Sequence, residues 1–202
     1  MKRCDGPGLD AWRGAWTPAE VTARLSGLDI SWCVVGGWAI DLWLGRQTRE
    51  HGDLEIAILR PDLARVRAHL ADFRFYAVGD GEVIALDEPS PDKHQTWIED
   101  PRTQLWCVDV MLELGDAETW IYRRDPTIRR ARSLMIGRTA DGIPYLQPEG
   151  MLLFKAKAVR PKDEADFAVA APLLSREAKA WLRDALAHAH PGHPWLAALT
   201  AA

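Results

Sequence analysis

Cysteine is scarce in this chain, and the few cysteines that occur follow no recognisable pattern. Cys4, Cys33 and Cys107 lie far apart, and none belongs to a Cys-x-x-Cys spacing. Their number is odd and we expect no secretory leader, so neither a disulfide framework nor a zinc site is expected. Cys33 and Cys107 lie in apolar segments and are predicted to be buried, unreactive thiols.

Long apolar runs and an excess of basic residues are also missing. No run of about 18 apolar residues occurs, so we expect no membrane span. The chain has 25 Lys and Arg against 29 Asp and Glu. A general nucleic-acid binder usually carries a strong basic excess, so no nucleic-acid partner is expected and a cytoplasmic protein is the default. A few locally placed cations can still bind a nucleotide.

What the sequence does contain is an ordinary globular composition with many tryptophans. Of the 202 residues, 48% are hydrophobic and 27% are charged, which is enough for one domain or two small ones. The ten tryptophans are spread along the chain, and we expect most of them in core and cleft packing. Trp38 and Trp97 are also candidates for stacking on a base or a sugar.

Short strands and short helices are predicted over the first 147 residues. Residues 1–16 are Gly-rich and polar and are predicted to form a loose, flexible lead-in. Thr17 to Glu20 has the Thr cap, early Pro and Glu of a helix start. An apolar strand is predicted over residues 32–35, followed by a Gly-Gly break at 36–37 and a short helix over 38–44 that is ended by Gly45. Further strands are predicted over residues 53–59, 73–78, 82–86, 105–112 and 119–122. An amphipathic helix is predicted after Pro61 and a polar loop over residues 87–96.

The character of the chain changes to helical after Pro148. Three helices and a short helical piece are predicted there, separated by prolines; they are residues 149–159, 162–173 and 176–189 and the piece near Trp195. We therefore predict an α+β protein, with a mixed-sheet α/β domain over residues 1–147 and a helical C-terminal domain over residues 148–202. The hairpins in the first part argue against a doubly wound dehydrogenase sheet.

Two acids spaced two residues apart, Asp53 and Glu55, begin one of the predicted strands. Residues i and i+2 of a strand point to the same face, with Cα atoms about 6.6 Å apart. Their carboxylates can converge on one divalent ion or bridge two, and Mg²⁺ prefers such oxygen ligands together with substrate phosphates. The alternative interpretation is that both acids form the solvated face of an edge strand.

A third acid, Asp109, lies inside the apolar segment 105–112. An unpaired charge is costly in such a buried strand, and a metal ion would supply the missing partner. Glu113 is the second candidate, but it comes at the end of the strand and is more simply solvated.

The Gly36-Gly37 pair lies between a predicted strand and a predicted helix. Glycines let the backbone approach a phosphate closely, and a helix N-terminus offers free N–H groups. Arg49 and His51 can add positive charge or hydrogen-bond donors near a triphosphate. The alternative for these two side chains is surface or structural contacts.

These residues, in this order, resemble the nucleotidyltransferase superfamily of the polymerase β type, and within it the aminoglycoside 2''-O-nucleotidyltransferase-like proteins and their lincosamide-modifying relatives. The resemblance touches most of the chain beyond residue 30, over residues 35–41, 44–55, 145–149, 152–157, 160–167 and 193–196. It implies a nucleotidyltransferase domain with a mixed sheet, a helical C-terminal domain, and an NTP in the cleft between them.

The resemblance also implies roles for single residues. Gly36 and Gly37 resemble the turn that holds the nucleotide phosphates. Asp53 and Glu55 resemble the metal-binding pair, although the family usually has aspartate at the second position, and Asp109 resembles the third carboxylate.

Basic residues of the helical part resemble the triphosphate-binding side chains of the family. Lys155 resembles the lysine that reaches the triphosphate. Lys157 is about 200° away from it on a helix, so we expect the two lysines not to face one ligand. Lys162 and Asp163 are expected to close the cleft or to pair with each other, the alternative being helix-surface charge.

The reaction implied is Mg²⁺-dependent transfer of a nucleoside monophosphate from an NTP, expected to be ATP, to a hydroxyl of a small polyhydroxylated compound such as an aminoglycoside antibiotic. Asp109 is expected to complete the metal site and act as general base, and Lys155 to stabilise charge on the triphosphate. Two alternatives remain: nucleotidyl transfer to a protein, as in a toxin–antitoxin pair, and a non-catalytic NTP-binding or interaction protein that keeps the fold.

Overall fold

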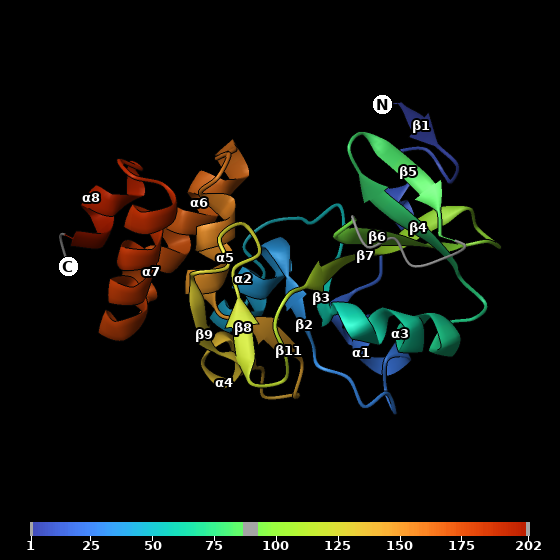
Figure 1. Cartoon of the computed structure of the whole chain (residues 1–202), viewed down its shortest axis with the longest axis horizontal. Helices are drawn as coiled ribbons and strands as arrows, with labels where there is room; N and C mark the ends of the chain where they lie inside the picture. The colour runs from blue at the N-terminus through green and yellow to red at the C-terminus, as the bar shows by residue number, and fades with distance from the viewer. Residues whose placement is uncertain (1, 87–92, 201–202) are drawn as a thin grey trace.

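A long mixed β-sheet runs through the centre of the protein. The computed structural model describes residues 2–86 and 93–200. In this part of the chain nine strands form one sheet in the order β1-β5-β4-β6-β7-β3-β2-β11-β10, and β8 and β9 form a separate two-stranded sheet. Helices α6, α7 and α8 gather at one end of the molecule and β1, β4 and β5 at the other (Figure 1).

The elements alternate along the chain until residue 146 and are helical afterwards. The strands are β1 (Arg3–Cys4), β2 (Trp32–Val35), β3 (Glu55–Leu59), β4 (Arg74–Gly79), β5 (Glu82–Ala85), β6 (Gln95–Asp100), β7 (Leu105–Glu113), β8 (Thr119–Ile121), β9 (Arg129–Ala131), β10 (Ile136–Arg138) and β11 (Pro144–Leu146). The helices are α1 (Pro18–Arg24), α2 (Gly36–Leu44), α3 (Leu63–His69), α4 (Arg132–Met135), α5 (Pro148–Lys155), α6 (Pro161–Ala170), α7 (Arg176–Ala189) and α8 (Trp195–Thr200), with 3₁₀ turns η1 (Trp12–Gly14), η2 (Arg60–Asp62) and η3 (Ala171–Leu173).

Strands β2, β3 and β7 form the middle of the sheet. β3 is antiparallel to β2 and parallel to β7, which places Glu55 beside Val35 on one side and beside Asp109 on the other. The neighbouring residues Ile56 and Val110 are fully buried, so they fix this register by packing into the core. The predicted α+β class with a mixed sheet is confirmed.

Local signals in the sequence place several elements correctly. The capping box is present: the Thr17 hydroxyl accepts a hydrogen bond from the Glu20 N–H at 3.3 Å, and the Glu20 carboxylate accepts one from the Thr17 N–H at 2.7 Å. Helix α2 begins at Gly36, two residues earlier than expected, and ends at Gly45, whose φ is 68°. Strand β2, the β4/β5 hairpin and α7 lie where they were predicted.

Residues 2–16 are not a loose lead-in, and this prediction is wrong. The Lys2 N–H donates to the Gly81 carbonyl at 2.8 Å and β1 pairs with β5. The Trp12 ring packs edge-on against Trp97 with centroids 5.1 Å apart, and the Trp106 indole N–H donates to the Gly8 carbonyl at 2.9 Å. The partners of this segment lie about 70 to 100 residues away, so its local composition gave no sign of them.

The segment before Pro148 contains more structure than the sequence indicated. The sequence did not predict the strands β9, β10 and β11 or the helix α4. Elements of three or four residues are too short to show a periodic pattern. β11 extends the sheet by pairing with β2 through Tyr145 and Val34. β6 begins at Gln95, inside the loop predicted over residues 87–96, and residues 87–92 of that loop lie outside the described residues.

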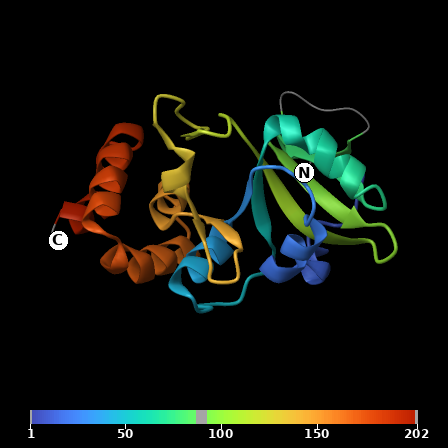
Figure 2. The same ribbon diagram turned by 90° about the horizontal axis from the view of Figure 1, so that it is seen from below.

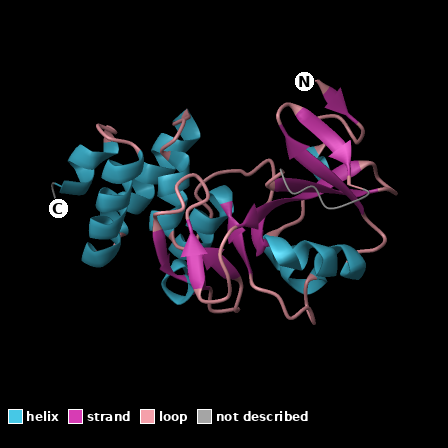
Figure 3. Cartoon of the chain, in the orientation of Figure 1, coloured by secondary structure: helices cyan, strands magenta, loops and turns pink. Residues whose placement is uncertain are grey.

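The helices lie on two parts of the sheet. α1 and α3 lie next to each other, where the His69 Nε2 is 2.8 Å from the Arg24 carbonyl oxygen, and Figure 2 shows both in front of strands of the large sheet. α5 and α6 pack against α2, and α7 packs against α5; Figure 3 shows this helical end beside the strands. A domain boundary at residue 147 stays a prediction. Among the described residues, every helix is too short or too polar to span a bilayer.

Candidate active site

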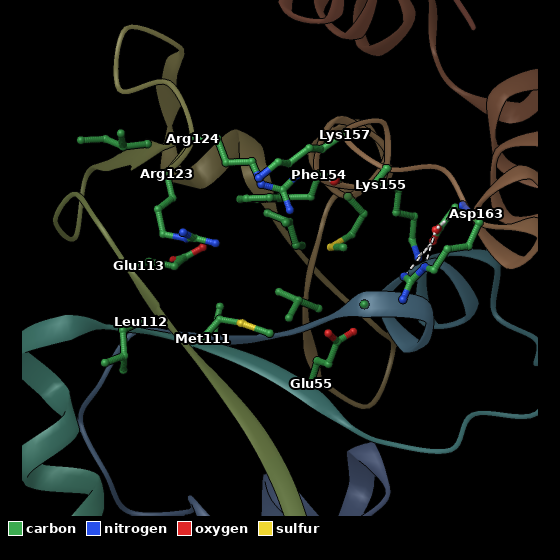
Figure 4. Close-up of a pocket in the computed structure, with 18 residues that line it drawn as sticks. Glu55, Met111, Leu112, Glu113, Arg123, Arg124, Phe154, Lys155, Lys157 and Asp163 are labelled. Carbon is green, nitrogen blue, oxygen red and sulfur yellow. Dashed lines mark hydrogen bonds and ion pairs between the residues drawn. The ribbon is translucent and has the colours of Figure 1, made fainter. Parts of the chain in front are cut away.

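A cavity of about 370 Å³ opens where the middle of the sheet meets α2 and α5. Its floor comes from the ends of β2, β3 and β7, and its far wall from α5 and the turn that follows (Figure 4). The charged side chains that line it are three acids and five bases: Glu55, Glu113, Asp163, Arg123, Arg124, Lys155, Lys157 and Arg160. The wall between them is apolar, so the cavity suits a ligand that combines negative charge with an apolar body.

At Gly36 the backbone comes into close contact with Glu55, one of the acids that line the cavity. Its φ is 70°, and a Cβ there would overlap with the Oε2 of Glu55. Only glycine therefore fits, both for its backbone conformation and for the close approach. The Glu55 carboxylate lies against the first residue of α2, where free N–H groups and the positive end of the helix dipole favour negative charge.

Glu55 and Asp109 lie side by side on two parallel strands. Asp109 is only 5% exposed; its Oδ2 accepts a hydrogen bond from the Gln95 amide, while its Oδ1 is buried with no partner among the described residues. Burial raises the pKa of Asp109 well above its usual value, and the neighbouring Glu55 raises it further. Burial, and then Asp53, likewise raise the pKa of Glu55. Carboxylates crowded in this way favour a nearby cation.

The acidic residues fit Mg²⁺ in chemistry, although they do not form a complete cage. Among the described residues, no group of three His, Cys, Asp or Glu side chains is arranged to hold a metal ion. Asp53 precedes β3, is partly exposed, and acts on Glu55 through its charge, but it does not line the cavity. Mg²⁺ usually takes one or two protein carboxylates and fills its remaining positions with water and phosphate oxygens, which matches the orphaned Oδ1 of Asp109 beside Glu55.

The three neighbouring acids Asp53, Glu55 and Asp109 are called the acidic corner below. Lys155 is a cation of the helical part whose charge acts on Glu55 in this corner. It is the last residue of α5, and its Nζ donates to the Asp163 Oδ1 at 3.1 Å and lies 2.8 Å from the Asp166 Oδ2. An ammonium group has three N–H donors, so two hold the side chain in place and the third remains for a ligand in the cavity. The triphosphate-binding role of Lys155 stays a prediction.

Lys157 lines the same cavity as Lys155, and the expectation that the two lysines face apart is wrong. The 200° separation assumed a helix through residue 159. α5 ends at Lys155, so Lys157 belongs to the turn that follows, and helical geometry does not apply to it. Arg160, which the sequence did not single out, lines the cavity from the same turn.

Arg49 and His51 make structural contacts, the alternative that the sequence left open. The Arg49 guanidinium pairs with the Asp166 carboxylate at 3.2 Å, and the His51 Nε2 lies 2.6 Å from the Asp41 Oδ2. A Cβ on Gly37 would overlap with Arg49 and contact the His51 ring. These three residues do not line the cavity; they join α2 to α6 behind it.

Two tryptophans considered for nucleotide stacking are engaged inside the protein. Trp38 stacks on the His51 ring with centroids 4.5 Å apart. Trp97 packs edge-on against both Trp12 and Trp106. Neither side chain lines the cavity, in agreement with the packing role expected of most tryptophans.

Asp163 binds both Arg160 and Lys155 beside the cavity. Replacing Asp163 with asparagine is therefore expected to destabilise the protein. It is 1% exposed, accepts from the Arg160 guanidinium at 2.8 Å, and also accepts from Lys155. We expect Asp163→Asn to lower the free energy of unfolding at pH 7 by about 2 kcal/mol, the typical value of a hydrogen bond to a charged group. Urea unfolding would measure the change, with the exposed Asp184→Asn as a matched control.

The loss should depend on pH in a defined direction. Burial alone would raise the pKa of Asp163, but the hydrogen bonds from Arg160 and Lys155 lower it well below its usual value. A carboxyl group with a lowered pKa in the folded state stabilises the protein above about pH 4 and ceases to do so as the pH falls further. Wild type and Asp163→Asn should therefore approach each other in stability as the pH falls below about 4; a difference that stays constant as the pH falls would contradict the assignment.

Solved structures share this fold. A crystal structure of ANT(2'')-Ia in complex with adenylyl-2''-tobramycin has a TM-score of 0.57 at 14% identity, over 84% of this chain and 95% of that one. The lincosamide antibiotic adenylyltransferase LnuA, bound to lincomycin, has a TM-score of 0.53 at 17% identity, over 74% and 91%. A nucleotidyltransferase-like protein from Paracoccidioides brasiliensis has a TM-score of 0.52 at 16% identity, over 98% and 94%. At such identities the likeness shows the fold.

The sequence pattern of the family described as aminoglycoside-2''-adenylyltransferase matches residues 19–89. This stretch holds the Gly-Gly turn, Asp53 and Glu55, so the match falls on the acidic corner of the cavity. The match covers about a third of the chain, and the solved structures show that the fold is shared. No curated protein sequence matches the chain.

The sequence-based prediction was also wrong for one acid of the cavity and did not identify two of its bases. Glu113 was expected to be solvated, but its Oε2 accepts from the Arg132 guanidinium at 2.9 Å and its Oε1 accepts from the Trp120 indole at 3.2 Å. The unpredicted segment that contains β9 and α4 brings Arg132 to it. Arg123 and Arg124 line the cavity from the turn after β8; their only signal was a pair of bases at the end of a short apolar strand.

Proposed function

We propose that this protein transfers a nucleoside monophosphate from an NTP, with ATP as the expected donor, to a hydroxyl group of a small molecule in a Mg²⁺-dependent reaction. The observation that carries the proposal is the shared cavity: Gly36 and Glu55 line it from the sheet, and Lys155 and Arg160 line it from the helical part. A helix N-terminus and two cations facing one acidic corner are what a metal-bound triphosphate requires.

The triphosphate is proposed to lie between the start of α2 and the turn after α5. The charges of Lys155, Lys162 and Arg160 all reach Glu55 and lower its pKa against the effect of burial, so positive charge is concentrated at this end. Lys155 is held by Asp163 and Asp166. A pre-positioned cation of this kind stabilises the charge that develops on the phosphates during transfer.

Asp53, Glu55 and Asp109 are the residues proposed to hold Mg²⁺. When bound, the metal neutralises phosphate charge and supports both the attacking and the leaving oxygen. The acceptor hydroxyl oxygen forms a bond to the α-phosphorus, the bond from that phosphorus to the bridging oxygen of the β-phosphate breaks, and pyrophosphate leaves with the electron pair. The hydroxyl proton passes to a carboxylate, for which Asp109 is the proposed general base.

The acceptor is proposed to be a small polyhydroxylated compound. Two of the structural neighbours are bound to lincomycin or to adenylyl-2''-tobramycin, and the matching family is one of aminoglycoside adenylyltransferases. These likenesses support an antibiotic-like acceptor in this protein as well, with the partners limited to the nucleotide and that molecule.

Nucleotide binding is the first test of this proposal. Calorimetry with ATP is expected to detect binding in the presence of Mg²⁺, and Asp53→Ala is expected to weaken it at least tenfold, because the variant loses one carboxylate of the acidic corner. Asp29→Ala, which removes an exposed aspartate away from the cavity, is the matched control. Absence of binding by the wild type in Mg²⁺ would refute the proposed function.

Transfer is the second test. A screen with radiolabelled NTPs against aminoglycosides, lincosamides and total cell protein would separate transfer to a small molecule from transfer to a protein. A protein that binds ATP tightly but labels nothing in the screen would be a non-catalytic nucleotide-binding protein.

A further inference from the structure

The cavity has a second basic end, distinct from the one that faces Glu55. Arg123 and Arg124 follow β8, and the like charges of Arg124 and Arg60 both act on Arg123, while Tyr122 acts in the opposite direction. Neither arginine is among the cations whose charge reaches Glu55. Glu113 lines this second end, whereas Asp109, the β7 neighbour of Glu55, does not line the cavity; the two acids are four residues, or about 13 Å of strand, apart.

Arg123 is a half-buried cation without a partner. Among the described residues it makes no hydrogen bond and no ion pair, and Figure 4 shows its side chain directed into the cavity. Arg124 differs, because its guanidinium donates to the Phe154 carbonyl at 2.5 Å and lies over the Phe154 ring at 5.3 Å. Burial first, and then the neighbouring arginines, lower the pKa of Arg123. An anionic ligand would relieve both effects.

The acids that line the cavity offer no place for an amine. Glu113 is paired with Arg132 and with the Trp120 indole. Asp163 is occupied by Lys155 and Arg160, and Glu55 belongs to the proposed metal corner. A polycationic acceptor would therefore meet Arg123, Arg124 and Lys157 and no free carboxylate among the acids that line the cavity, which disfavours it by like-charge repulsion.

We propose that Arg123 binds an anionic group, a phosphate or a carboxylate, on the acceptor, so that the preferred acceptor is a negatively charged hydroxyl compound and not a polyamine. The proposal rests on the proposed nucleotidyl transfer. Within its acceptor class of small polyhydroxylated compounds, it favours anionic members over polycationic antibiotics such as tobramycin. The apolar wall between the two ends, which includes Met111, Met151 and Phe154, accommodates the body of such a molecule. Its hydroxyl then extends toward the α-phosphate at the Glu55 end.

The test uses a matched pair of probes, ribose 5-phosphate and ribose, that differ by one anionic group. The full-length protein is first saturated with Mg²⁺ and α,β-methylene-ATP, which cannot transfer its nucleotide, and each probe is then titrated by calorimetry. We expect ribose 5-phosphate to bind at least tenfold more tightly than ribose, and more tightly than tobramycin. Arg123→Gln should weaken ribose 5-phosphate binding about tenfold or more, because a charge-assisted hydrogen bond is lost.

Controls separate this effect from damage to the fold and from nucleotide binding. Arg123→Gln should melt at the wild-type temperature because Arg123 has no hydrogen-bond or ion-pair partner in the described part of the chain. Arg183→Gln on the exposed face of α7 should bind every probe like wild type. Equal affinity for ribose 5-phosphate and ribose would overturn the proposal and leave the proposed function standing. If Arg123→Gln weakens the ATP analogue as much as ribose 5-phosphate, the arginine serves the triphosphate and the proposal also fails. No binding of the ATP analogue at all would refute the proposed function itself.

Discussion

Asp109→Asn is expected to lower kcat for nucleotidyl transfer by about 10²- to 10⁴-fold, the range typical for loss of a general base, while ATP still binds. The amide keeps the size of the side chain and can still bond with Gln95, but it can neither accept the acceptor proton nor compensate a metal charge. Single-turnover transfer with radiolabelled ATP would measure the loss, and calorimetry would measure nucleotide affinity.

A second buried acid supplies the matched control for Asp109. Glu99 on β6 is 2% exposed and accepts a hydrogen bond from the Tyr76 hydroxyl, away from the cavity. Glu99→Gln makes the same carboxyl-to-amide change in the same sheet and should keep its turnover. Turnover in Asp109→Asn equal to that of wild type would eliminate Asp109 as the third carboxylate.

Gly36→Ala is expected to reduce transfer on the order of 10²-fold, the cost that a displacement of about 1 Å can have in an active site. The added methyl group would overlap with the Glu55 carboxylate, and φ at this position is 70°. Glu55 must therefore move, and the start of α2 must move with it. The variant should also lose stability, which thermal melting would detect.

The Gly45→Ala variant distinguishes the effect of the overlap with Glu55 from the effect of the strained backbone conformation. Gly45 has a φ of 68°, nearly that of Gly36, but a Cβ there would meet no atom within 4 Å. Both variants should lose comparable stability from the left-handed conformation, whereas only Gly36→Ala should lose transfer. Equal activity losses in the two variants would mean that the close approach of Gly36 to Glu55 has no functional role.

Much of the proposed site follows from short motifs. Asp53, Glu55 and the Gly-Gly turn lie within one segment of about 20 residues, and the Gly-Gly turn follows an apolar strand and opens a short helix. The placement of Asp109 beside Glu55 could be suspected because a charge in an apolar strand requires a partner. The register that makes them neighbours, however, depends on the pairing of β3 with β7, which no local pattern specifies.

The wrong predictions have two causes, contacts with residues distant in the sequence and a helix that ends earlier than expected. The lead-in was called loose because its partners Trp97 and Trp106 are far along the chain. Lys157 was placed on the wrong side because the helix ends two residues before it. Glu113 was called solvated because Arg132 reaches it from an unpredicted segment. In each case a contact distant in sequence, or the end of an element, decided the outcome.

The sequence by itself determined the local elements and the chemistry available: a helix start at Thr17, a glycine where φ is positive, an acidic pair at the head of β3, and basic residues after Pro148. Such features depend on backbone hydrogen bonds and side-chain spacing within a few residues. Only the tertiary structure decided which of these residues share a cavity. It paired Arg49 with Asp166 and His51 with Asp41, and it placed Lys155 on the same cavity as Glu55. It left Arg123 without a partner among the described residues. Packing between distant segments is the reason, because it sets which charges are paired and which remain for a ligand.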